Sequence, residues 1–261
     1  MKGARPKLGQ NFLVDRNILD VIERLAELSD NDVVLEVGGG QGVLSSRLAE
    51  RAAFVHVVEL DASLEPDLRA VVEGYDNARL HMGDAVSIDL VSLDPKPNKM
   101  IANLPYGVAA TVILRTIAEL ETIRSWVVMV QREVGERFAA TPGSSAYGIP
   151  SVLAQLQCEV KVLRPVGRGV FRPVPNVDSV LLGLHRRAGG CAGTTVTALV
   201  HDAFAHRRKA LAGSLALAGR WPPGIRERAR SALVEMGLPA DSRAERLSPE
   251  QFVEFAARLG S

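Results

Sequence analysis

The hydrophobic positions of this chain follow two different periods through about its first 155 residues. Short apolar runs of strand length recur, and between them apolar residues return every three or four positions. Residues 15–28, for example, place five apolar side chains on one helical face behind Asp15, a favourable N-cap. Strands that alternate with helices predict βαβ units and a parallel sheet covered by helices on both faces. The strand-length runs are residues 33–37, 54–60, 78–82, 99–104 and 125–131.

A different pattern begins after about residue 155. Residues 159–163 and 177–184 have the character of strands with no helical segment between them, which predicts an antiparallel hairpin at the sheet edge. A linker of small residues, 189–193, then leads into segments that all have helical periodicity. We therefore predict an α/β domain over residues 1–188 and a small all-helical domain over residues 194–261.

Composition places the chain among ordinary globular proteins, since 47% of its 261 residues are hydrophobic and 23% are charged. Its apolar runs are too short to span a bilayer, and the basic residues near the N-terminus have no apolar stretch behind them. Its two cysteines and five histidines show no spacing typical of a disulfide framework or a metal site. We expect a cytoplasmic protein that holds no metal.

Basic residues are concentrated in one part of the sequence. The whole chain has a net charge of +1, yet residues 161–211 contain nine basic residues and only two acidic ones. Such a block is typical of proteins that bind a polyanion. It is equally compatible with a solvated basic face, so both interpretations stand on composition alone.

Polar residues and glycines directly follow the first three predicted strands. Residues 38–42 form a glycine turn before a helix, where a ligand can approach the backbone and the helix N-terminus favours a carboxylate or phosphate. Val43 stands where the dinucleotide fingerprint requires its third glycine, which argues against a dehydrogenase. Glu59, after the second strand, can accept both hydroxyls of a ribose. Asp84, after the third, can accept a hydrogen bond from an adenine amino group.

Each acid taken singly is compatible with an ordinary loop residue or a helix cap. The carboxyl ends of parallel strands, however, meet at one edge of a sheet. Together these positions predict a crevice for an adenosine-bearing ligand at that edge.

The fourth strand ends in Asn103-Leu104-Pro105-Tyr106, which suits methyl transfer to the exocyclic amine of adenine. That nitrogen is a poor nucleophile because its lone pair is delocalised into the ring. The Asn103 side-chain oxygen and a nearby backbone carbonyl can bind its two N–H groups and favour a pyramidal nitrogen, so no strong general base is required. Pro105 stiffens the loop, and Tyr106 offers a face for an extruded base. The alternative is an ordinary Asn-x-Pro turn with a core tyrosine.

Together with further motifs, these features resemble the ribosomal RNA adenine-N6,N6-dimethyltransferases that use S-adenosylmethionine. The family opens with G-Q-N-F-L, here residues 9–13, and later has a phenylalanine before a proline-spaced V-D-S, here residues 171–179. An R-R-K run at 207–209 and R-A-E-R-L-S at 243–248 resemble the bacterial branch that acts on small-subunit (16S) rRNA. They separate the chain from the resistance enzymes that methylate large-subunit rRNA.

The resemblance implies a Rossmann-like class I methyltransferase sheet, and it implies roles for particular residues. The glycine turn would hold the methionine part of S-adenosylmethionine, and Tyr106 and Phe171 would stack on opposite faces of the flipped adenine. From spacing alone, Phe171 is also compatible with a core aromatic at a turn. The implied cofactor-binding residues are Gln10, Asn11, Leu13, Gly38, Gly40, Glu59, Asp84 and Asn103. The implied catalytic residues are Asn103, Leu104, Pro105, Tyr106 and Phe171. The RNA-binding residues expected from the basic block are Arg168, Arg207, Arg208 and Lys209.

The implied activity is transfer of methyl groups to the N6 amines of two adjacent adenines near the 3′ end of small-subunit rRNA during ribosome assembly. The products are N6,N6-dimethyladenine and S-adenosylhomocysteine. We expect a monomer that acts on rRNA within a pre-assembled small subunit, with no membrane partner. Two alternatives are a large-subunit rRNA methyltransferase that confers antibiotic resistance, against which the helical tail argues, and a mainly non-catalytic assembly factor.

Two positions depart from the family pattern. Gly39 stands where proline or alanine is commoner, and we expect it to loosen the turn without abolishing binding. Pro150 stands where the family has an apolar residue, and it bears on where the next helix begins.

Overall fold

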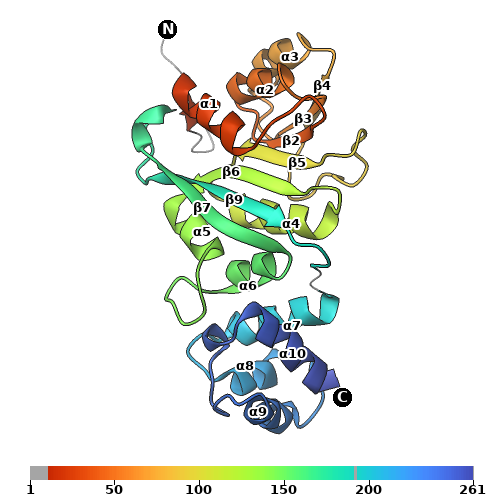
Figure 1. The fold of residues 1–261 in the computed structure, drawn as a ribbon, viewed down its shortest axis with the longest axis vertical. Helices are drawn as coiled ribbons and strands as arrows, with labels where there is room; N and C mark the ends of the chain where they lie inside the picture. The colour runs from red at the N-terminus through yellow and green to blue at the C-terminus, as the bar shows by residue number, and fades with distance from the viewer. Residues whose placement is uncertain (1–10, 191–192, 261) are drawn as a thin grey trace. The chain divides into compact units, whose positions relative to one another are not determined.

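A computed structural model describes residues 11–190 and 193–260 (Figure 1). The chain divides into two compact units. The first comprises the described residues up to Gly135 together with Val160–Arg186, and the second comprises Glu136–Glu159 and the described residues after Arg186. Residues 136–159 therefore pack with the C-terminal helices although they precede residue 188. As a boundary between domains that fold or act separately, residue 188 stays a prediction.

The first unit is built on a seven-stranded sheet with the strand order β4-β3-β2-β5-β6-β9-β7. The five strands β4, β3, β2, β5 and β6 are parallel to one another, whereas β9 is antiparallel to β6. The predicted parallel sheet is thus confirmed, and the two late strands extend it on one side. The strands are β2 Val33–Val37, β3 Phe54–Glu59, β4 Ala78–Met82, β5 Lys99–Asn103, β6 Ser125–Gln131, β7 Cys158–Val166 and β9 Ser179–Arg186.

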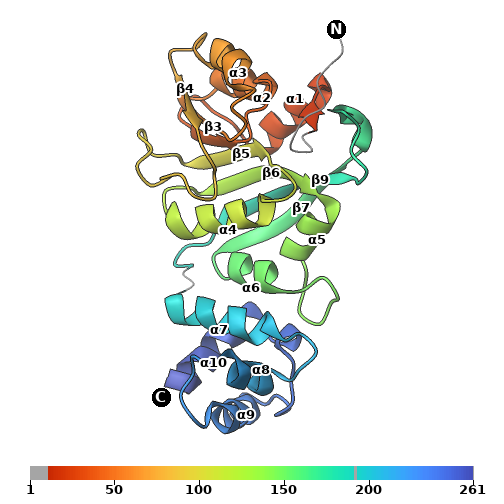
Figure 2. The ribbon, with the colours of Figure 1, turned by 180° about the vertical axis from the view of Figure 1, so that it is seen from behind.

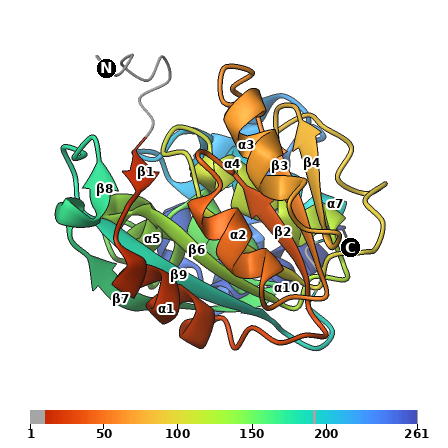
Figure 3. The ribbon, with the colours of Figure 1, turned by 90° about the horizontal axis from the view of Figure 1, so that it is seen from above.

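Helices cover both faces of this sheet, as the alternating pattern predicted. Figures 2 and 3 show α1, α2 and α3 on one face and α4 on the other. The core under the first group is apolar, and Leu48, Val57 and Leu68 in it are almost completely buried. The bounds of these helices are α1 Arg16–Leu25, α2 Val43–Ala49, α3 Glu65–Val72 and α4 Ala109–Glu119, and the short α5, Arg132–Phe138, follows β6 directly.

A second, two-stranded sheet joins distant parts of the chain, and no periodicity predicts it. β1 (Phe12–Leu13) pairs antiparallel with β8 (Phe171–Arg172), next to a short 3-10 helix, Arg168–Val170. A strand of two residues has too few positions to show alternation. The pairing is nevertheless important, because it fixes where Phe12 and Leu13 of the G-Q-N-F-L segment lie.

The second unit is a cluster of helices around aromatic side chains. The ring centroid of Phe204 lies 6.2 Å from that of Tyr147 and 5.9 Å from that of Phe252. Pro150 occupies the first turn of α6, where a missing N–H costs nothing, so this helix begins at Ile149. No helix in the described part of the chain is both long and apolar enough to cross a membrane. The helices of this unit are α6 Ile149–Gln155, α7 Thr194–Ala205, α8 Leu211–Ala218, α9 Ile225–Glu235 and α10 Pro249–Gly260, with a 3-10 turn at Ala244–Arg246.

Candidate active site

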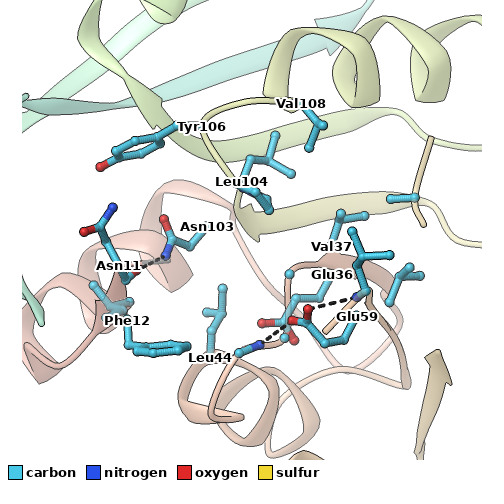
Figure 4. A pocket seen from close by; sticks show the side chains of 18 of the residues that line it. Asn11, Phe12, Glu36, Val37, Leu44, Glu59, Asn103, Leu104, Tyr106 and Val108 are labelled. Carbon is cyan, nitrogen blue, oxygen red and sulfur yellow. Dashed lines mark hydrogen bonds between the residues drawn. The ribbon is translucent and has the colours of Figure 1, made fainter. Parts of the chain in front are cut away.

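A cavity of about 310 Å³ opens at the carboxyl ends of β2, β3, β4 and β5 (Figure 4). The strand order reverses there, since β3 lies on one side of β2 and β5 on the other, and open α/β sheets bind ligands at such a point. The polar residues that follow the successive strands therefore converge. The predicted site residues that line the cavity are Asn11, Leu13, Gly38, Gly40, Glu59, Asp84, Asn103, Leu104, Pro105 and Tyr106.

Glu59 is buried, and the surrounding backbone fixes its carboxylate. Oε2 accepts a hydrogen bond from the Gly40 N–H group at 2.9 Å. Oε1 accepts from the N–H groups of Leu60 and Asp61 at 2.8 and 2.9 Å. Three donors hold the carboxylate in one orientation and leave its remaining lone pairs for a ligand. The geometry suits the acceptance of hydroxyl groups.

The glycine turn lies close against the loop that follows β5. Gly38 has a φ of +84°, which L side chains rarely adopt. A Cβ atom there would lie 3.3 Å from both the backbone oxygen of Asn103 and the Cδ atom of Pro105. A side chain at this position would therefore crowd the loop as well as strain the backbone, and glycine lets the two walls of the cavity approach each other.

Asn103 is held in one orientation by the N-terminal segment. Its Nδ2 group donates a hydrogen bond to the backbone oxygen of Asn11 at 3.3 Å, the contact drawn in Figure 4. This bond fixes how the amide is turned, and its Oδ1 atom, the acceptor of the side chain, can accept a hydrogen bond from a ligand. Asn11 thus contributes to the site through its backbone.

Tyr106 is half-buried, and its hydroxyl forms a 2.9 Å hydrogen bond with the hydroxyl of Ser179 on β9. Burial raises the pKa of Tyr106 above its usual value, and the bond to Ser179 lowers it in part. The phenol therefore remains neutral at physiological pH. The contact fixes the ring at the cavity wall.

Asp84 belongs to a compact turn after β4. Its Oδ1 atom accepts a hydrogen bond from the Val86 N–H group at 2.8 Å. Its backbone oxygen accepts from the N–H groups of Ser87 and Ile88 at 2.9 and 2.7 Å. Since the turn uses only one carboxylate oxygen, the other can meet a ligand.

Glu36 also lines the cavity, and the sequence analysis gave it no role. It is almost completely buried on β2, and among the described residues its Oε2 atom has no hydrogen-bond partner. Burial raises the pKa of Glu36 to about 8; the neighbouring Ser45 lowers this value in part, and the charge of Glu59 raises it. A lone carboxyl within an otherwise apolar strand was the signal available in the sequence. In the part of the chain that the structure describes, no three or more His, Cys, Asp or Glu side chains are grouped to hold a metal.

Apolar side chains complete the walls, and these residues were not predicted as site residues either. Phe12, Leu44 and Val108 line the cavity beside the polar residues (Figure 4). Phe12 lies within the G-Q-N-F-L motif, and Leu44 and Val108 each lie two residues after a predicted motif. Hydrophobicity alone does not distinguish a cavity wall from a core position.

Two predicted site residues do not line the described cavity. Gln10 lies outside the described residues. Phe171 is completely buried in the same core cluster as Leu13, its register partner across the small sheet. In this arrangement the ring offers no face to a ligand, so the structure does not support the predicted stacking role of Phe171.

The predicted RNA-binding residues differ in their surroundings. Arg168 faces Asp178, with 3.5 Å between Nε and Oδ1. Arg207 donates through Nη2 to the backbone oxygens of Ser145 and Tyr147 at 2.9 and 3.0 Å. The exposed Arg208 and Lys209 make no side-chain hydrogen bond or ion pair with any described residue.

The strand order reverses at the glycine turn after β2, Glu59 ends β3 and Asp84 follows β4, and Asn103 ends β5. This arrangement is that of a class I methyltransferase. The family model described as ribosomal RNA adenine dimethylase matches residues 1–259 of this sequence. The chain therefore belongs to the ribosomal RNA adenine dimethylase family.

Named relatives are similar over nearly the whole chain. The ribosomal RNA small subunit methyltransferase A of Rubrobacter xylanophilus is 43% identical over 98% of this chain and 95% of its own length. The protein of the same name from Streptomyces coelicolor is 42% identical, covering 97% of this chain and 91% of that protein.

Solved structures agree with the fold. A dimethyladenosine transferase from Plasmodium falciparum has a TM-score of 0.78 and 25% identity, with 94% of this chain and 95% of that chain covered. The 23S rRNA methyltransferase ErmE has a TM-score of 0.70 and 28% identity, with 96% of this chain and 100% of that chain covered.

Proposed function

We propose that this chain transfers methyl groups from S-adenosylmethionine to the N6 amines of two adjacent adenines near the 3′ end of small-subunit rRNA. The observation that carries this proposal is the convergence of Glu59, Asp84 and Asn103 on one cavity. The names of the relatives at 43% and 42% identity support the small subunit as the source of the RNA. We further propose that the protein acts as a cytoplasmic monomer on rRNA within a partly assembled subunit.

The residues present fit an S-adenosyl ligand. The fixed Glu59 carboxylate suits the ribose hydroxyls, and the remaining Asp84 oxygen suits the adenine amino group. The turn at Gly38 and Gly40 is left for the methionine part, beside the buried Glu36 Oε2 atom, which has no hydrogen-bond partner among the described residues. When bound, S-adenosylmethionine supplies an electrophilic methyl group on its sulfonium sulfur.

Asn103 prepares the target nitrogen. Its Oδ1 atom accepts a hydrogen bond from one N–H group of the adenine amine, and a backbone oxygen of the loop at residues 103–106 accepts a hydrogen bond from the other N–H group. The two acceptors favour a pyramidal nitrogen whose lone pair points away from the ring. The proton becomes acidic only as the new N–C bond forms, so the loop needs no strong base. The bond from Asn103 Nδ2 to Asn11 keeps Oδ1 in place.

Tyr106 holds the target base. Taking an adenine out of its stack costs a few kcal/mol, and stacking on an aromatic ring returns about 1–3 kcal/mol per base. The hydrogen bond between Tyr106 and Ser179 orders the ring before the base arrives, so less freedom is lost on binding.

A large-subunit substrate is less well supported. ErmE, the 23S rRNA methyltransferase, is 28% identical to this chain, well below the small-subunit relatives. A purely non-catalytic assembly role is also disfavoured, because the Asn103 loop and the polar residues opposite it are all placed in the cavity.

The variant Asn103→Ala tests this assignment. We expect it to lose most methyl transfer, by about 100-fold or more, since it removes an acceptor that acts only on the reacting nitrogen. Affinity for S-adenosylmethionine in calorimetry should fall only a few-fold, because Glu59 and Asp84 are unchanged. Full turnover in the variant would contradict the role of Asn103. A wild-type protein that binds no S-adenosylmethionine would contradict the proposed function itself.

A further inference from the structure

Arg115, an arginine of α4, anchors one turn of the cavity wall through its guanidinium group. Its Nη1 group donates to the backbone oxygen of Ala85 and its Nη2 group to that of Ile88, both at 2.8 Å. Its Nε group donates to Oε2 of Glu119, one helical turn further on, at 2.9 Å. The side chain is only 16% exposed, so these charge-assisted bonds are partly shielded from water.

Both carbonyl groups belong to the turn at residues 83–88, which we call the Asp84 turn. Ala85 lines the cavity directly. The side chain of Ile88 packs on Gly83, another lining residue, since its Cδ1 atom lies 3.0 Å from where a Cβ of Gly83 would be. Arg115 therefore holds the turn at Ala85, the residue after Asp84, and at Ile88, whose side chain packs on Gly83, the residue before Asp84.

The other end of α4 is attached to the loop that carries Asn103. The Pro105 backbone oxygen accepts hydrogen bonds from the N–H groups of Val108 and Ala109, where α4 begins. One helix thus sets the position of the Asn103 loop through its first turn and that of the Asp84 turn through Arg115. A guanidinium can reach two carbonyl oxygens at once because its N–H groups form a rigid fork, which the single ammonium of a lysine cannot reproduce.

We propose that Arg115 is a positioning residue that sets the Asp84 turn for selective recognition of an adenine ring. This inference rests on the proposed use of an S-adenosyl ligand. Asp84 selects adenine by accepting a hydrogen bond from its amino group, and a 6-oxo purine offers an acceptor at the same place. Selectivity between the two requires the carboxylate to be held still, and Arg115 holds it through the backbone of the turn.

The test measures by calorimetry how much more tightly the protein binds an adenine compound than its 6-oxo analogue, expressed as the ratio of the two affinities. S-adenosylhomocysteine and its 6-oxo analogue, S-inosylhomocysteine, are titrated into wild type, Arg115→Met and Arg115→Lys. We expect both variants to lower the preference for the adenine compound by about fivefold or more. Arg69→Met is the matched control, because Arg69 is a helical arginine bonded to Glu65 and Glu73 on the surface of α3. It should keep the wild-type ratio.

An arginine that only stabilised the fold would lower the melting temperature and leave the ratio unchanged. An unchanged ratio in folded Arg115→Lys, or an equal change in Arg69→Met, would overturn the inference. In an Asp84→Asn background, Arg115→Met should lower the ratio no further, because both changes act on one contact; a full additional decrease would also overturn it. If wild type bound no S-adenosylhomocysteine, the proposed function would fail instead.

Discussion

Glu36 shows at the scale of a single residue how the cavity departs from ordinary packing. Its carboxyl group is almost completely out of contact with water, and one of its oxygens has no hydrogen-bond partner in the part of the chain that the structure describes, so the group is costly to ionise. Burial raises its pKa to about 8, so the group is largely protonated at neutral pH. As an acid with a proton to donate, it differs from Glu59 beside it, whose carboxylate is surrounded by N–H donors.

Glu36 should make the stability of the ligand-free protein depend on pH. Its pKa is about 8 in the folded protein and near the ordinary 4.5 when unfolded, so the folded state binds the extra proton between these values. The stabilising contribution is therefore complete below about pH 4.5. It is lost as the pH rises to 8, by at most about 1.4 kcal/mol per pH unit.

Thermal unfolding of Glu36→Gln checks this expectation. The melting temperature of the variant relative to wild type should rise between pH 5.5 and pH 8.5, because glutamine stays neutral throughout. Glu73→Gln, at the exposed C-cap of α3, serves as control and should show a much smaller trend. Parallel curves for Glu36→Gln and wild type would show that the carboxyl is not buried in its neutral form.

The site residues differ in whether a short stretch of sequence is enough to predict them. Glu59, Asp84 and Asn103 could be predicted because each follows a clear strand, and parallel strands bring their carboxyl ends together. Glu36 stands out only as a lone carboxyl in an apolar strand, and Arg115 does not stand out at all, since a polar residue inside an element does not reveal its partners. Phe171 was assigned from a motif, and the pairing that buries it depends on two-residue strands that show no periodicity.

At the scale of elements, the strands and helices of the first unit were predictable because each is long enough to show its period. The sheet order places β7 beside β9 at the sheet edge, where the hairpin was predicted. The association of residues 136–159 with the C-terminal helices was not predictable. It depends on tertiary contacts such as the bond from the Tyr147 hydroxyl to the backbone oxygen of Leu247, 2.9 Å, which leave no local pattern.

Gly39, just after β2, is packed closely against side chains of β3 and α3. A Cβ atom there would lie 2.5 Å from Cγ1 of Val57 and 2.9 Å from Cδ2 of Leu68. The expectation of a loosened turn thus lacks support, because these side chains occupy the space that alanine or proline would need.

Gly39→Ala should lower the unfolding free energy by about 1–3 kcal/mol in urea denaturation. The double variant with Val57→Ala should lose less than the sum of the two single changes; additive losses would show that the two sites do not touch.

At the scale of the whole molecule, the basic block (residues 161–211) contains side chains bonded to other parts of the protein and side chains that are exposed. Arg207 is bonded to the backbone near Tyr147, so its replacement would disturb the second unit as well as any RNA contact. Arg208 and Lys209 are exposed and separate these effects better.

We expect Arg208→Glu with Lys209→Glu to weaken RNA binding and flatten its salt dependence. Each lost phosphate contact reduces the slope of log K against log salt concentration by about 0.7–0.9. Filter-binding titrations at several salt concentrations measure this slope. Arg24→Glu, an exposed reversal on α1 outside the block, should leave it unchanged. An unchanged slope in the double variant would remove these two residues from the interface.

The most direct measurement supplies the protein with S-adenosylmethionine carrying a labelled methyl group. One reaction contains unmethylated small ribosomal subunits, a second contains large-subunit rRNA, and mass spectrometry of RNA fragments locates the label. The proposed function predicts N6,N6-dimethyladenine at two adjacent positions near the 3′ end of the small-subunit rRNA and no label in the large-subunit rRNA. Label confined to large-subunit rRNA, or absent from both, would contradict it.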